Sequence, residues 1–192
     1  MNIMSPSDSP SDRILPAPGR YADLPPRCLM DRRQALQELR RPAQPLQLRA
    51  QIYAFGTESL LVCATTSISE AGEVAKLAAS VSDEALGLAV LDQLLQCCAH
   101  PMPNMREAKA TTWPAFIASG AKTVRAFEHA STSVSVETAG MGLKVEGRRH
   151  APPSETYVGR LRSITGNPLE LGAAVREVIK IVRLLDSQDA LF

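Results

Sequence analysis

The chain has 192 residues, of which 45% are hydrophobic and 21% charged. These proportions are ordinary for a globular domain, and the length is sufficient for one hydrophobic core. No apolar run approaches the roughly 20 residues that a membrane-spanning helix needs, and the N-terminus lacks a basic region followed by an apolar stretch. We therefore expect a cytoplasmic protein without a secretory signal or a membrane span.

The net charge of +1 is unevenly distributed along the chain. Residues 51–100 contain one lysine and six acidic residues, and the segments on either side are basic. A general nucleic-acid binder would be more basic overall. The acidic middle could face a basic partner, or its carboxylates could be solvated at loops and helix starts.

In chain order, residues 1–26 are rich in Ser, Pro and Asp and are typical of a tail that buries little apolar surface. Residues 29–40 could form a short helix that ends before Pro42. Residues 46–52 then alternate between apolar and polar, which predicts a strand. After a turn at 56–58, the apolar run 60–64 predicts a central strand. We treat residues 27–192 as a single domain.

An internal repeat is the most informative feature of the sequence. The segments VSDEALGLAVLDQLLQC (81–97) and GNPLELGAAVREVIKIV (166–182) share a Leu-Gly pair and an Ala-Val pair at a spacing of 85 residues. Both carry apolar residues at i, i+3, i+4, i+8 and i+11, which is one face of a helix. A mid-helix glycine in each copy, Gly87 and Gly172, indicates close packing of the helix on a sheet.

The repeat extends upstream of these two helices. In each copy, a hairpin and a third extended segment precede the helix, at about 46–97 and 131–185, and residues 112–130 form a bridging helical pair. Thr112 could cap the first bridging helix, which would carry Trp113, and Thr123 could cap the second. Two such units predict an α/β fold of the α+β type, with one mainly antiparallel sheet and helices packed on it.

Motifs that carry chemistry are not evident. No His or Cys pair has metal-ligand spacing, and no phosphate-binding loop or nucleophile elbow occurs. We predict no catalytic residue, no metal site and no cofactor, and free thiols at all four cysteines, Cys28, Cys63, Cys97 and Cys98.

Three segments carry a resemblance to a known family: TWPAFIASGAKTVRAFEHA, the VSVE…LKVEG hairpin and the closing PLELGAAVREVIKIV helix. Together with SDEALGLAVLDQL, they resemble the CdiI-type immunity proteins of bacterial contact-dependent growth inhibition systems, over about residues 46–185. The resemblance implies a toxin inhibitor, not an enzyme, that binds the C-terminal toxin domain of a cognate CdiA effector 1:1 in the cytoplasm. Such toxins are often nucleases, including tRNases.

The family offers no interface residues to transfer, so the candidate contact surface comes from charge. We expect the acidic segment 58–84 to supply part of it, through Glu58, Glu70, Glu73, Asp83 and Glu84. Two other classes stay open. One is a small enzyme with a non-contiguous site. The other is a nucleic-acid-binding module that uses Arg148, Arg149, Arg160 and Arg162.

Overall fold

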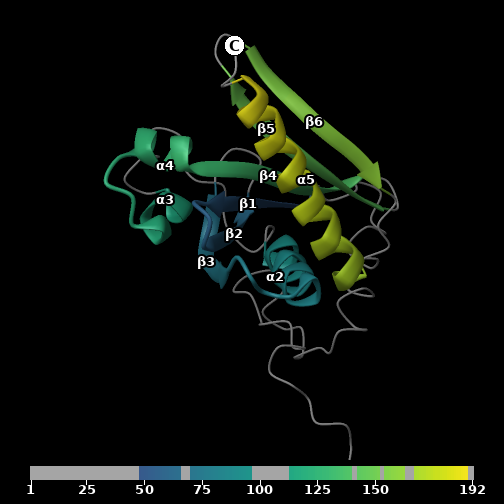
Figure 1. Ribbon diagram of the computed structural model, residues 1–192. Coiled ribbons are helices and arrows are strands. Elements are labelled where there is room, and N and C mark those ends of the chain that lie inside the picture. The colour runs from purple at the N-terminus through teal and green to yellow at the C-terminus, as the bar shows by residue number, and fades with distance from the viewer. Residues whose placement is uncertain are drawn as a thin grey trace, which may run out of the picture.

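The computed structural model describes residues 48–65, 70–96, 113–139, 142–151, 154–162 and 167–189. Figure 1 shows an α+β fold in which three strands and a helix occur twice, with two short helices between the two units. The first unit consists of β1 (Arg49–Phe55), β2 (Ser59–Thr65), β3 (Glu70–Ala78) and α2 (Asp83–Gln96). The short helices are α3 (Pro114–Ser119) and α4 (Val124–Ala130). The second unit consists of β4 (Ser131–Ala139), β5 (Gly142–Ala151), β6 (Ser154–Arg162) and α5 (Pro168–Asp189).

The six strands form one antiparallel sheet in the order β3-β2-β1-β4-β5-β6. The two units therefore meet edge to edge at its centre, where Ile52 of β1 lies opposite Val134 of β4. From this seam outward, the first, second and third strands of each unit follow one another, β1-β2-β3 on one side and β4-β5-β6 on the other. This is the pattern of a two-fold arrangement. The predicted antiparallel sheet built from two hairpin–strand–helix repeats is confirmed.

Strict alternation along the central strands places one apolar row toward α2 and α5. Burial in β1 and at the start of β4 falls on every second residue, because successive side chains of a strand point to opposite faces. These residues form the main core with the apolar faces of both helices. In Figure 1, α2 and α5 lie together on this face of the sheet.

The two repeat glycines lie where α2 and α5 cross. A Cβ atom on Gly87 would lie 1.8 Å from the carbonyl oxygen of Pro168, and one on Gly172 would lie 1.8 Å from that of Asp83. Each glycine thus faces the first residue of the other helix. The close packing predicted at these positions exists, but the prediction that it is against the sheet is wrong, because the neighbour is a helix backbone.

Capping side chains begin these helices. Ser82 Oγ accepts from the backbone N–H of Ala85 at 3.2 Å, and Asn167 Oδ1 accepts from that of Leu169 at 3.0 Å. Asp83 and Glu84 lie in the first turn of α2, where carboxylates favour the helix dipole. Hydrogen bonds between residues close in sequence therefore favour both helix starts, independently of tertiary packing.

A β-bulge interrupts the β2–β3 ladder and is filled by a buried glutamine. The register shifts between Val62 and Ala64, and Gly72 in the bulge has φ of +78°. Gln93 of α2 is 95% buried; its Oε1 accepts from the Ala64 N–H at 2.8 Å and its Nε2 donates to the Glu73 carbonyl at 3.1 Å. One side chain thus satisfies backbone groups that the broken ladder leaves unpaired.

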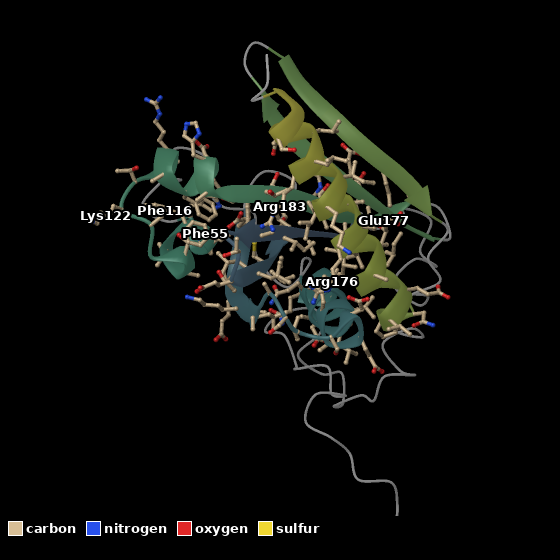
Figure 2. All side chains as sticks on the ribbon, viewed as in Figure 1. Phe55, Phe116, Lys122, Arg176, Glu177 and Arg183 are labelled. Atoms are coloured by element: carbon tan, nitrogen blue, oxygen red, sulfur yellow. The ribbon has the colours of Figure 1, made fainter. Side chains whose placement is uncertain are left out.

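Two arginines of α5 tie it to the first unit (Figure 2). Arg176 Nε donates to Asp83 Oδ1 at 2.6 Å, and its other nitrogens donate to the carbonyls of Ala79 and Val81 in the β3–α2 connection. Arg183 Nη2 donates to the Gly56 carbonyl at 2.6 Å in the β1–β2 turn. The turn predicted at 56–58 is confirmed, with Gly56 at φ +57°.

Several predictions lie outside the described residues, namely the tail 1–26, the helix 29–40, Thr112 and three of the cysteines. Among the described residues, Cys63 is buried and free. Trp113 was expected inside the first bridging helix, and this is wrong: it is the N-cap residue, with extended φ and ψ, because Pro114 begins the helix. No described helix has the length and apolarity that crossing a membrane requires.

Candidate partner-binding groove

On the face of the sheet opposite α2 and α5, the helices that the structure describes cover one half only. The short helices α3 and α4 pack on the β1–β3 side, where Leu61, Cys63, Ala115 and Phe127 form a second buried cluster. Figure 1 shows this helical pair beside β1–β3, on the other side of the sheet from α5. The outward residues of β4 and β5 therefore line the half that α3 and α4 leave uncovered.

Local capping builds this helical cover. Gly120 ends α3 in the left-handed conformation, with φ of +71°. Thr123 Oγ1 caps α4 by accepting from the Ala126 N–H at 3.1 Å, as predicted. Trp113 supplies no side-chain cap to α3. Glu70 of β3 takes that role instead, because its Oε2 accepts from the Ala115 N–H at 3.0 Å. This long-range cap fixes α3 on the sheet.

An aromatic cluster forms the edge of the cover. The Phe127 ring is fully buried, and its centroid lies 5.0 Å from Trp113, 5.1 Å from Tyr53 and 5.7 Å from Phe55. Phe116 joins it at 6.1 Å; Figure 2 shows Phe55 and Phe116 on the same side of the sheet. Aromatic pairs in such edge and tilted geometries stabilise each other beyond their buried area, so ring packing helps to hold this wall together.

Two ionisable side chains beneath this wall are held neutral. Burial raises the pKa of the Tyr53 hydroxyl well above its ordinary value, and the nearby Glu70 carboxylate adds to the effect. Burial also raises the pKa of the Cys63 thiol, again with Glu70 contributing. Since a reactive cysteine needs an accessible thiolate, Cys63 is suited to packing and not to nucleophilic chemistry.

The opposite wall of the open face is ionic. Arg49 Nη2 of β1 lies 3.2 Å from Glu137 Oε2 of β4, and Lys144 Nζ of β5 lies 3.4 Å from Glu137 Oε1. Lys144 also pairs with Glu146, whose hydrogen bond raises the pKa of the lysine. Charges of both signs therefore alternate across three neighbouring strands.

Strand register arranges these side chains in three rows across β1, β4 and β5. The rows are Tyr53–Ser133–Arg148, Gln51–Ser135–Glu146 and Arg49–Glu137–Lys144. In the first two rows the central residue is a serine, which is short, and in the third it is the bridging Glu137. A trough therefore runs along β4 over the serines and is closed at one end by the ion pairs of the third row.

We call this surface the β4 trough; its volume is about 280 Å³. Its lining comes from both units and from the helical cover: Arg49, Gln51, Tyr53, Trp113, Phe127, Glu128, Ser131, Ser133, Ser135, Glu146, Gly147 and Arg148. With an aromatic wall on one side and charged side chains on the other, it is the candidate binding surface of the described residues. No group of three or more His, Cys, Asp or Glu side chains among the described residues could hold a metal ion.

No family model matches the chain, and no curated protein matches it. Among solved structures, it is similar to a chain of the CdiA-CT/CdiI toxin and immunity complex from Yersinia pseudotuberculosis, with 17% identity and a TM-score of 0.49, over 70% of this chain and 97% of that one. A protein of unknown function, NMB0488 from Neisseria meningitidis, is similar at 17% identity and a TM-score of 0.47, over 71% and 96%. Likeness at this level says nothing about activity.

The five acidic residues predicted as a contact surface do not lie on one patch. Glu58 is exposed in the β1–β2 turn, and Glu73 is exposed on β3 at the bulge. Asp83 and Glu84 begin α2, on the helical face, where Asp83 is paired with Arg176. Glu70 is half-buried on the opposite face, as the cap of α3. Two of the five thus have structural partners, and Glu58, Glu73 and Glu84 are exposed.

Of the four arginines of the predicted basic patch, the structure describes the side chain of Arg148, which lies in the β4 trough. The trough itself was not predicted. Its signal was the segment STSVSVE, where valines alternate with serines. Serines at three successive outward positions of a central strand indicate a surface that another molecule could occupy. The flanking walls come from residues far apart in the sequence.

Proposed function

We propose that this chain is an immunity protein that binds the C-terminal toxin domain of a cognate CdiA effector and neutralises it in the cytoplasm. The resemblance of residues 46–185 to CdiI-type immunity proteins supports a toxin domain as the partner. The toxin we expect is a nuclease. The chain itself would act by binding and not by catalysis.

The β4 trough is the observation that carries the proposal. Trp, Tyr and Arg are the residue types that dominate binding energy at protein interfaces, and Trp113, Tyr53 and Arg148 line one trough about 280 Å³ in volume. Its walls are held by ring packing and its closed end by ion pairs, so little ordering is needed on binding. A preformed surface of mixed aromatic and charged character suits a protein partner.

Growth of a sensitive strain tests the proposal. The strain expresses the toxin domain encoded directly upstream, with and without this protein, and the purified pair is examined by light scattering and calorimetry. We expect rescue together with a 1:1 complex. Rescue without a complex would indicate an enzyme or an RNA-protecting protein. A folded protein that forms no complex and gives no rescue would end the immunity hypothesis.

A further inference from the structure

The β4 trough contains polar groups that the described part of the chain leaves without partners. The Glu128 carboxylate is exposed on α4 at the edge of the trough, and no described residue pairs with it. On the floor, Ser131 Oγ donates to the Phe127 carbonyl and Ser135 Oγ to that of Glu146. By contrast, no described residue bonds to the Ser133 hydroxyl or to the Gln51 side-chain amide. These three free groups can all accept hydrogen bonds.

The cations of the trough are already engaged. Arg49 is paired with Glu137, which also contacts Lys144. Arg148 has an interaction of its own within the protein. The other trough carboxylate, Glu146, is paired with Lys144. Among the described residues, Glu128 is thus the trough carboxylate without a counter-ion, and it would attract a cationic group of a ligand.

The aromatic wall narrows the choice of cation. Trp113 is half-buried and packs against Phe127 with an interplanar angle of 88° and against Tyr53 with one of 71°. Indole is the most favourable ring for a cation. A guanidinium group is planar, stacks on aromatic rings and carries five donors, whereas an ammonium does not stack. The volume of about 280 Å³ lies at or below the lower limit of small-molecule sites, which suits one long side chain.

We propose that the β4 trough binds an arginine side chain of the partner protein, stacked against Trp113 and paired with Glu128. This inference rests on the proposed function and names the contact through which the toxin is held. The free acceptors Ser133 and Gln51 would receive the remaining guanidinium donors. A nuclease surface, which is rich in arginine where it contacts phosphates, presents such side chains.

Trp113 is the only tryptophan of the chain, so its fluorescence reports directly on the trough. The first probe is N-acetyl-arginine amide, titrated into the full chain, with N-acetyl-citrulline amide as its neutral isostere. We expect a saturable change with the arginine compound at millimolar concentration and none with citrulline. Glu128→Gln should weaken arginine binding about tenfold. Glu170→Gln, the same change at an exposed position in the first turn of α5, should leave it unaltered.

The second arm uses the toxin domain encoded upstream. Glu128→Gln should raise the Kd of the complex about tenfold, mainly through faster dissociation, and Glu170→Gln should not. A complex whose affinity is the same with Glu128→Gln, together with equal responses to arginine and citrulline, would overturn the arginine site while leaving the proposed function standing. A saturable response to a mononucleotide in place of arginine would assign the trough to nucleic acid. The absence of any complex would instead contradict the proposed function.

Discussion

Gly172 of α5 lies directly against the backbone of Asp83, the first residue of α2, so that an added Cβ would lie 1.8 Å from the Asp83 carbonyl oxygen. The same contact joins Gly87 to Pro168, which places the two helices at a backbone-to-backbone crossing. No side chain can be accommodated at this separation without moving a helix.

The first prediction follows from this crossing. In an exposed helix, Gly→Ala stabilises by up to about 1 kcal/mol, but Gly172→Ala should lower the free energy of unfolding by about 1–3 kcal/mol through overpacking, and Gly172→Leu by more. Urea unfolding measures both. Ala173→Ser, at the exposed neighbouring position, is the control and should change stability by less than about 0.5 kcal/mol. A neutral Gly172→Ala would show that the helices do not meet here.

The second prediction concerns Gln93. Replacement by Met keeps the length and apolar packing of the side chain but leaves the Ala64 N–H and the Glu73 carbonyl without their partner. An unpaired buried polar group costs about 1–3 kcal/mol, so Gln93→Met should destabilise the protein by roughly 2–3 kcal/mol. Gln96→Met, at the half-buried end of α2, should have little effect. Equal unfolding midpoints for the two variants would contradict the bulge-bridging role.

The third prediction is a loss of stability at alkaline pH. Burial raises the pKa of Cys63 and of Tyr53 in the folded state, so above about pH 9 the unfolded chain releases protons that the folded chain keeps. The free energy of unfolding must then fall as pH rises, by up to about 1.4 kcal/mol per pH unit for each group. Urea unfolding between pH 7 and 10 measures the slope.

The variant Cys63→Ala isolates one of these groups. It should be less stable than the parent at pH 7, because it leaves a cavity, but its stability should fall less steeply between pH 9 and 10. Stability of the parent should be nearly flat between pH 7 and 8. An identical slope for parent and variant above pH 9 would show that Cys63 is not held protonated in the folded state.

The fourth prediction separates the acidic surface from the trough. Glu58 and Glu73 are exposed and remain candidates for steering a basic toxin. The double variant Glu58→Lys/Glu73→Lys should slow association severalfold and flatten its dependence on ionic strength, with the dissociation rate nearly unchanged. Stopped-flow kinetics at several salt concentrations measure both rates. An unchanged association rate would remove these residues from the contact surface.

The sequence predicted the framework because the framework is periodic. Alternation in residues 46–52 and the 85-residue repeat were sufficient for an antiparallel sheet of two units, and Thr123 was identified from local chemistry as the cap of α4. Alternation and helix caps depend on residues that are close in sequence, so they can be recognised in a single sequence.

The trough could not be predicted in this way, since it depends on which residues lie opposite one another. Tyr53, Ser133 and Arg148 form a row only through the register of β1, β4 and β5. Glu70 was assigned to a charged surface, yet it caps α3 across the sheet. Charge and spacing along the chain do not reveal such long-range contacts. For the same reason, Gly172 was expected to pack on the sheet, whereas it packs against the backbone of α2.

The β1–β4 seam and the reciprocal glycine contacts between α2 and α5 together have the self-matching character of an interface in a symmetric dimer. A dimer of one repeated unit would dissociate on dilution and would present two identical binding faces. With both units on one chain, assembly no longer depends on concentration, and each unit is free to diverge. Leu61 and Cys63, on the outward side of β2, are apolar and lie in the cluster under α3 and α4, whereas the outward residues of β5 are charged and no described helix covers them. A sheet built from two similar units can thereby have one binding surface that differs between the two halves.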